Sequence, residues 1–275
     1  WYFFRYMEDE KRDEVFVSDE ALDYWQNVDL YIGGSEHATG HLLYSRFWVK
    51  FLYDRGLSPV DEPFKKLINQ GMILGNSALV HRVMGENKLV SSGLETDYDT
   101  YPIHADVSMV DEHDQLDIEA FRKWRAEFKE AEFIKDKGVF KVSREVEKMS
   151  KSKYNVVNPD DICEQYGADT LRMYEMFLGP LEQSKPWNTA GITGVHNFLK
   201  RLWNLFHSGA EGSFFVEEDS SDNNGMKTLH KTIKKVKEDI ESFSFNTSVS
   251  TFMIAVNELT ADKVYSRRVL EPLLV

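Results

Sequence analysis

The sequence is poor in the residues and runs that mark secreted and membrane proteins. Its 275 residues include a single cysteine, Cys163, so an internal disulfide framework is excluded and a reducing, cytoplasmic location is expected. We interpret Cys163 as a core-packing residue. No stretch approaches the roughly 18 apolar residues of a membrane span, and residues 1–5 have no signal-peptide layout. The sequence therefore predicts a soluble globular protein with no membrane partner.

Several catalytic signatures are missing as well. Nothing in the chain matches Gly, four residues, Gly, Lys and Ser or Thr, so there is no P-loop, and there is no Gly-x-Ser-x-Gly elbow. Cys163 has no activating neighbour in the sequence. P-loop nucleotide hydrolysis, elbow-type serine catalysis and thiol catalysis are therefore not expected.

Positive charge is also scarce, because the formal net charge is -13. Broad, non-specific binding to nucleic acid needs a concentrated positive surface, so DNA is not expected as a partner. Five lysines nevertheless cluster in one helical segment, at positions 227, 231, 234, 235 and 237. This cluster is consistent with a local RNA contact and equally with a solvated charged face.

The first part of the chain alternates strands and helices, which is typical of an α/β fold with a parallel sheet. Residues 28–34 form a short apolar run, and an apolar-rich helical segment extends from Glu36 to about Tyr53, stopping at Gly56. Residues 66–70 are a second strand candidate. We expect the helix to be buried against the sheet by Leu42, Leu43, Phe47, Trp48, Phe51 and Leu52.

The rest of the chain is expected to hold an inserted module and a helical bundle. Short β-like pieces at 88–91 and 103–110 indicate a small α+β module over residues 76–145, and Asp117 can cap a helix that runs to Phe128. Between 146 and 190 we expect two short helices, which begin at Asn158 and break at Gly167. Residues 191–275 show no convincing strand and predict an all-α bundle, whose lysine-rich helix would bury Ile233, Val236 and Ile240.

Residues 148–152, named the lysine loop from here on, read Lys-Met-Ser-Lys-Ser and are followed by Lys153, Tyr154 and Asn155. Several ammonium groups and two hydroxyls within a few residues are suited to gripping a polyphosphate. A solvated lysine and serine loop is the alternative. A five-residue string of this kind is a specific motif when its context agrees, and we interpret it as an indication of nucleotide chemistry.

A second candidate site is the turn Gly33-Gly34-Ser35-Glu36-His37, between the first strand and the helix. Glycines allow a ligand to approach the backbone, and free helical N–H groups face it. His37 and His41 share one helical face. This spacing leaves open a zinc site and histidines satisfied within a packed helix, although the metalloprotease pattern has Glu where Ala38 stands. His104 and Asp106 are interpreted as polar strand positions.

Residues 31–38 with His41-Leu42-Leu43-Tyr44 and Arg46-Phe47, the step at 70–72 and residues 148–152 together resemble class I aminoacyl-tRNA synthetases, and within them the leucine-specific members. The Gly-Gly-x-Glu-His turn is similar to theirs, whereas the isoleucine, valine and methionine enzymes usually vary it. Residues 1–6 are similar to the strand that leads back into the active site. The resemblance covers 1–75 and 146–275 and is weakest over 76–145, where that family carries a variable insertion.

The resemblance implies activation of leucine by ATP with Mg²⁺ and transfer to tRNA(Leu). It implies the second half of a Rossmann-like catalytic domain over 1–75, a leucine-specific-type insertion over 76–145, the lysine loop and stem-contact region over 146–190, and a partial anticodon-binding domain over 191–275. Lys148 and Lys151 are implied to be catalytic, with Tyr2 and His41 beside the leucine side chain and no protein metal ligand. The residues implied to bind ATP are Gly33, Gly34, Glu36, His37, Gln70, Met149, Ser150, Lys151 and Ser152.

The ends of the sequence and its missing motifs limit this expectation. The chain starts at Trp1 without an initiator Met and stops on apolar residues, which predicts that a longer chain was cut at both ends. It contains no His-Ile-Gly-His signature and no editing domain, so the resemblance implies that these residues alone are inactive. A non-catalytic tRNA-binding paralogue and a valine or isoleucine enzyme remain alternatives.

Overall fold

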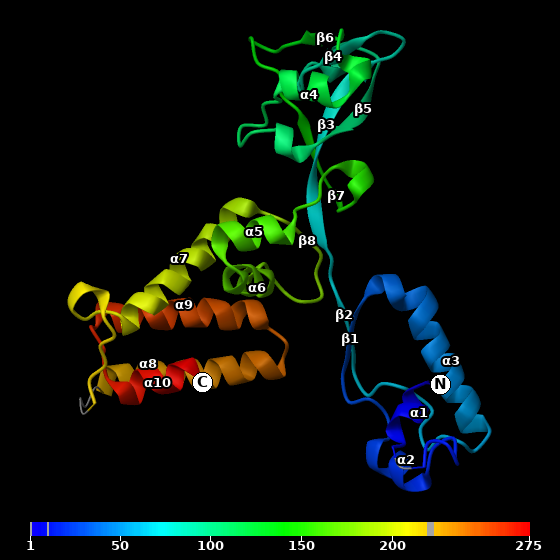
Figure 1. The fold of residues 1–275 in the computed structure, drawn as a ribbon, viewed down its shortest axis with the longest axis vertical. Helices are drawn as coiled ribbons and strands as arrows, with labels where there is room; N and C mark the ends of the chain where they lie inside the picture. Colours follow the sequence, from blue (N-terminus) through cyan, green and yellow to red (C-terminus); the bar gives the residue numbers. More distant parts are fainter. Residues whose placement is uncertain (1, 10, 219–222) are drawn as a thin grey trace. The chain divides into compact units, whose positions relative to one another are not determined.

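The structure is a computed structural model that describes residues 2–9, 11–218 and 223–275. The chain divides into two compact units; Figure 1 draws most of the first in blue to cyan and the second in cyan to red. The first contains Trp1–Met72 with the short return segment Glu182–Ser184, and the second contains Ile73–Leu181 and Lys185–Val275.

The first unit is built around two parallel strands, β1 (Tyr31–Gly34) and β2 (Leu67–Gln70). Helix α3 (Leu43–Asp54) lies between them in the sequence. Gly56 follows this helix with a φ of 71°, as a helix C-terminus commonly requires. The predicted order of strand, glycine turn, helix and parallel strand is therefore confirmed for this part of the chain.

The start of the first unit differs from the prediction. Residues 2–7 form helix α1 (Tyr2–Met7), not a strand, and helix α2 (Asp19–Trp25) follows. Phe4 is 1% exposed and packs in a cluster with Leu22, Val49 and Leu52. The Arg5 guanidinium donates hydrogen bonds to the carbonyls of residues 15 and 16, at 2.6 and 3.1 Å. These contacts stabilise the helical turn, so the strand prediction is wrong over 2–6, and Trp1 lies outside the described residues.

The burial expected for α3 is also only partly found. Leu42, Val49 and Leu52 are buried, but the exposed fractions of Leu43, Phe47 and Phe51 are 59%, 60% and 45%. The helix packs through Val49 and Leu52 onto the α1 and α2 cluster, while the sheet described here has two strands. A sheet this narrow offers too little area to cover a wide apolar stripe.

The second unit begins with β3 (Ile73–Val83), an 11-residue strand that organises a mixed sheet. Its partners are antiparallel β4 (Lys88–Val90), β5 (Thr100–Ala105) and β7 (Ser143–Lys148), and parallel β8 (Lys185–Pro186). Strand β6 (Glu132–Ile134) pairs with β4. The sequence pattern predicted only short β pieces after residue 76 and missed β3. The predicted strand over 103–110 ends at Ala105 and gives way to a 3₁₀ turn.

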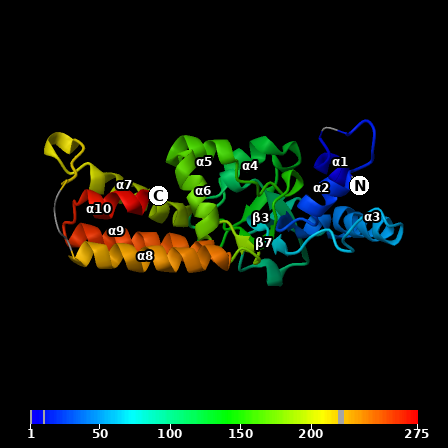
Figure 2. The ribbon, with the colours of Figure 1, turned by 90° about the horizontal axis from the view of Figure 1, so that it is seen from below.

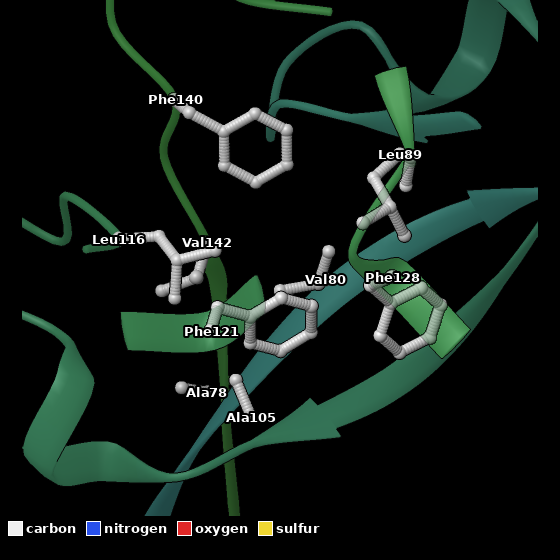
Figure 3. Packing of buried hydrophobic residues seen from close by; sticks show 10 residues of the cluster. Ala78, Val80, Leu89, Ala105, Leu116, Phe121, Phe128, Phe140 and Val142 are labelled. Atoms are coloured by element: carbon white, nitrogen blue, oxygen red, sulfur yellow. The ribbon is translucent and has the colours of Figure 1, made fainter. Parts of the chain in front are cut away.

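An aromatic core fills the space between this sheet and helix α4 (Ile118–Trp124), as Figure 3 shows. Phe121 and Phe128 are fully buried and stack with their ring centroids 5.2 Å apart. Asp117 caps α4 by accepting from the Ala120 N–H at 2.9 Å, which confirms the predicted cap. The α-helix stops at Trp124, however, and Phe128 lies in a separate 3₁₀ turn, so the predicted helix was too long.

The remaining helices follow the lysine loop and gather into a bundle (Figure 2). They are α5 (Pro159–Tyr166), α6 (Ala168–Phe177), α7 (Thr189–Phe206), α8 (Asn223–Glu241), α9 (Phe245–Ala261) and α10 (Arg267–Leu274). Asn158 caps α5, and Gly167 separates α5 from α6 at a φ of 89°, both as predicted. Cys163 is only half-buried on α5, so its assignment to the core is wrong. None of the described helices is long and apolar enough to cross a membrane.

The buried face of α8 is not the predicted one. Leu229, Thr232 and Asp239 are buried, whereas Ile233 and Ile240 are 45% and 53% exposed and Val236 is half-buried. The buried positions recur at helical spacing along the face of α8 that packs on α9, its principal helical neighbour. Each isoleucine follows a buried residue by one position in the sequence and therefore lies on a different face of the helix, where it lines an open groove beside α10. The apolar stripe was therefore rotated relative to the real contact.

Candidate functional site

The glycine turn brings five predicted residues to one edge of the first unit. Gln70 ends β2 and lies in register opposite Gly34, so both stand at the carboxyl ends of parallel strands. A Cβ on Gly34 would come within 2.1 Å of the Glu36 carboxylate, so only glycine lets that side chain fold back over the turn. Gly33 and His37 flank this pair. Nucleotides bind at such strand ends in open α/β sheets.

The two histidines of the turn are not buried within a packed helix. The backbone runs through a 3₁₀ turn, Ser35–His37, and a π-helical turn, Ala38–Leu42, before α3 begins. The rings of His37 and His41 lie 6.2 Å apart, and the His41 Nε2 is 2.5 Å from the hydroxyl of Tyr31. Phe64 stacks on Tyr31 at 4.3 Å. Both imidazoles are exposed, with His41 oriented by a tyrosine that the sequence reasoning missed.

A metal site at these histidines finds no support in their neighbours. The Glu36 Oε1 lies 4.0 Å from the His37 Nε2, and across the described ranges no three His, Cys, Asp or Glu side chains converge in a way that could hold an ion. Tyr2, the other residue expected beside leucine, begins α1, but its side chain lies outside the described part of the structure.

In the second unit, the lysine loop leaves the end of β7. Lys148 is the last residue of that strand, and Ser150 caps a short 3₁₀ turn over Lys151–Lys153 by accepting from the Ser152 N–H at 3.3 Å. The side chains of Lys148 and Lys151 are exposed, and no carboxylate of the described residues forms an ion pair with either. Two cations without counter-charges are available to a polyanion.

Met149 turns toward the protein interior instead. It is half-buried and lines a small apolar cavity of about 150 Å³ together with Ile73, Val157 and Trp187. The loop therefore presents its charged residues to solvent on one side and its apolar residue to the body of the unit on the other.

The loop is anchored by Asn155, a residue that the sequence reasoning did not single out. Its side chain is 1% exposed, and its Oδ1 accepts from the Ser150 N–H at 2.9 Å. Its Nδ2 donates to the Ser77 hydroxyl at 2.8 Å and to the Lys148 carbonyl at 3.4 Å. Gly75 leaves room for it, because a Cβ there would approach Asn155 to 2.7 Å. No periodicity marks such an anchor in the sequence.

Glu147 forms a second anchor at the base of the loop. Its carboxylate accepts from the Lys153 ammonium and from the His104 Nε2, the latter at 2.8 Å. Hydrogen bonds from Lys153 first, then from Ser77 and His104, lower the pKa of Glu147 to about 2. His104 is thus a polar strand position on β5, as expected. Asp106 lies just after β5 and caps the next turn by accepting from the Ser108 N–H, so its assignment to the strand is wrong.

The lowered pKa of Glu147 predicts that part of the free energy of unfolding is lost in acid. Because its folded pKa is about 2 and its ordinary value is 4.5, Glu147 stabilises the fold above pH 4.5 and loses that contribution as pH falls toward 2. Glu147→Gln is therefore expected to lower the urea midpoint near pH 7 and to differ progressively less from the parent between pH 4.5 and 2. Glu145→Gln, at an exposed position on the same strand, is the matched control. A constant difference at every pH would contradict the assignment.

Comparison with known proteins finds relatives whose matches span these residues. The family described as "tRNA synthetases class I (I, L, M and V)" matches residues 137–185, which include the lysine loop. Leucine–tRNA ligase of Christiangramia forsetii is 69% identical over the whole chain, and that of Cytophaga hutchinsonii is 62% identical. The chain covers 28% and 30% of these relatives.

A solved structure agrees with the sequence matches. LeuRS of Agrobacterium radiobacter K84, in a ternary complex with tRNA and LeuAMS, superposes with a TM-score of 0.59 at 25% identity, covering 99% of this chain and 28% of that one. The matched region, which includes the lysine loop, is similar to the class I aminoacyl-tRNA synthetases. Within this class, the chain corresponds over its full length to part of the leucine–tRNA ligases, and the resemblance seen in the motifs is confirmed.

Proposed function

We propose that the natural protein containing these residues is a leucine–tRNA ligase, and that this chain contributes part of its ATP site. The observation that carries the proposal is the lysine loop, with two exposed cations that lack counter-charges, in a chain 69% identical throughout to a leucine–tRNA ligase. The cytoplasm is the proposed location. The chain spans less than a third of these relatives' length, and the residues here are proposed to be inactive by themselves.

The reaction proposed for the natural protein has two steps. A carboxylate oxygen of leucine attacks the α-phosphorus of ATP, the bond from that phosphorus to the bridging oxygen breaks, and pyrophosphate leaves. A terminal ribose hydroxyl of tRNA(Leu) then attacks the leucyl carbonyl, and AMP leaves. The leucine carboxylate is already ionised at neutral pH, so positioning and charge stabilisation carry the first step.

The site residues receive roles in this scheme by proposal. Lys151, with Lys148 beside it, stabilises the negative charge that develops on pyrophosphate. Met149, Ser150 and Ser152 shape the loop that closes after ATP binds. The residues proposed to contact the adenosine are Gly33, Gly34, Glu36, His37 and Gln70.

The same proposal covers the amino acid, the metal and the tRNA. His41 and Tyr2 would border the leucine side chain. Mg²⁺ would enter with ATP and offset part of the charge of its phosphates. In the α8 cluster, Lys235 is paired with Asp239, which leaves the other cluster lysines for a local contact with tRNA(Leu).

Charging of tRNA tests the proposed function. The natural full-length protein, given ATP, Mg²⁺ and radiolabelled leucine, is expected to attach leucine to tRNA(Leu) and to leave non-cognate tRNA uncharged. A protein that binds tRNA(Leu) but attaches no amino acid would instead be a non-catalytic paralogue, and the proposal would fail.

A further inference from the structure

We propose that Asn155 is a positioning residue for leucine activation, which sets the backbone of the lysine loop so that Lys148 and Lys151 present their charges together. The inference rests on the proposed function. It concerns a residue outside the Lys-Met-Ser-Lys-Ser string, whose side chain is buried.

The first argument is the fixed geometry of its hydrogen bonds. One amide group holds the first and the middle residue of the string, because its oxygen accepts from the Ser150 N–H and its nitrogen donates to the Lys148 carbonyl. The same nitrogen is tied at 2.8 Å to the Ser77 hydroxyl on β3, and Ser77 is fully buried. These hydrogen bonds attach the loop backbone to β3, the long strand of the sheet. The shape of the loop therefore does not depend on its exposed lysines.

The second argument is that the preceding residue, Tyr154, adopts an unfavourable backbone conformation that places Asn155 here. Tyr154 has left-handed backbone angles, φ 52° and ψ 34°, which are disfavoured for a non-glycine residue. Its ring packs edge-to-face on Trp124 at 4.7 Å, and the Arg125 guanidinium lies 4.6 Å over the Trp124 ring. These contacts offset the strain and turn the chain so that Asn155 points inward.

The third argument is the fate of Lys153, the next cation along the chain. Its ammonium is paired with Glu147, which His104 also contacts. Lys153 is therefore neutralised at the base of the loop, while Lys148 and Lys151 are not. The pair of Lys153 with Glu147 fixes the base of the loop, and the charges of Lys148 and Lys151 stay available to a polyanion.

The test uses the natural full-length protein and single-turnover leucyl-adenylate formation. Asn155→Ala is expected to lower the maximal rate about 10- to 100-fold, as small misplacements of catalytic groups do, with the KM for leucine unchanged. Asn158→Ala is the matched control, because it removes an exposed helix cap three residues further on and is expected to keep the parental rate.

A double-mutant cycle separates positioning from mere stability. In a Lys151→Ala background, Asn155→Ala is expected to lower the rate less than about twofold, because residues that act as a unit are strongly non-additive. If Asn155→Ala does not fold, Ser77→Ala supplies the same cycle with a smaller first effect. Equal effects in both backgrounds, or a parental rate for Asn155→Ala or, in its place, Ser77→Ala, would overturn the inference. Absence of leucine-dependent activity in the parent would instead overturn the proposed function.

Discussion

Lys151→Ala in the natural full-length protein is expected to slow leucyl-adenylate formation about 100- to 1000-fold, which is the usual effect of removing one preorganised charge-stabilising group. The side chain is exposed and has no carboxylate partner among the described residues, so its charge is free for the leaving pyrophosphate. Leucine affinity should barely change, because the lysine interacts with the phosphates. Single-turnover kinetics and equilibrium leucine binding measure the two quantities separately.

A second lysine controls this experiment for the loss of a charge. Lys129 is exposed directly after the 3₁₀ turn Ala126–Phe128, and Lys129→Ala is expected to keep the parental rate. Lys151→Arg retains the charge with a different shape and should recover part of the activity. An unaltered rate of adenylate formation in Lys151→Ala would contradict the role given to the loop.

Phe121→Ala is expected to destabilise the chain by about 3–5 kcal/mol, the usual range for deleting a fully buried phenylalanine ring. Phe121 has no exposed surface and stacks on Phe128, in the core that holds α4 to β3. The loss combines the transfer of the ring from water with the cavity that remains. Urea unfolding of the 275-residue chain, followed by tryptophan fluorescence, measures it.

Phe214→Ala is the matched control, since that ring is 60% exposed. Its unfolding free energy should stay within about 0.5 kcal/mol of the parent, as is usual for surface substitutions. A loss below about 1 kcal/mol for Phe121→Ala would show that the core around α4 tolerates the cavity by collapsing, contrary to the packing described.

Local sequence signals predicted the parts of the fold that depend on near neighbours. The glycine turn, the end of α3 and the Asp117 and Asn158 caps each need one or two residues in a fixed order, and the structure has them there. The parallel pairing of β1 with β2 followed from the intervening helix. The predicted match to the class I synthetases likewise depended on short, contiguous strings.

Features that depend on distant partners were not predicted. Strand β3 is long because it pairs with β4, β5, β7 and β8, and its own sequence pattern does not reveal these partners. The burial of Asn155 follows from Ser77, 78 positions earlier, and from the space beside Gly75. The apolar faces of α3 and α8 were judged by composition, whereas the helix packed against each decides which residues are covered. The contacts that give Glu147 and Tyr31 their roles can be recognised only in the folded chain.

Amino-acid-dependent exchange of pyrophosphate into ATP is the most direct test of the central claim, that these residues belong to a leucine-activating site. The natural full-length protein would be assayed with leucine, isoleucine, valine and methionine in parallel, with Lys151→Ala beside the parent. We expect rapid exchange with leucine, much slower exchange with the other three and little in the variant. Exchange that is absent with leucine, or fastest with another amino acid, would contradict the claim.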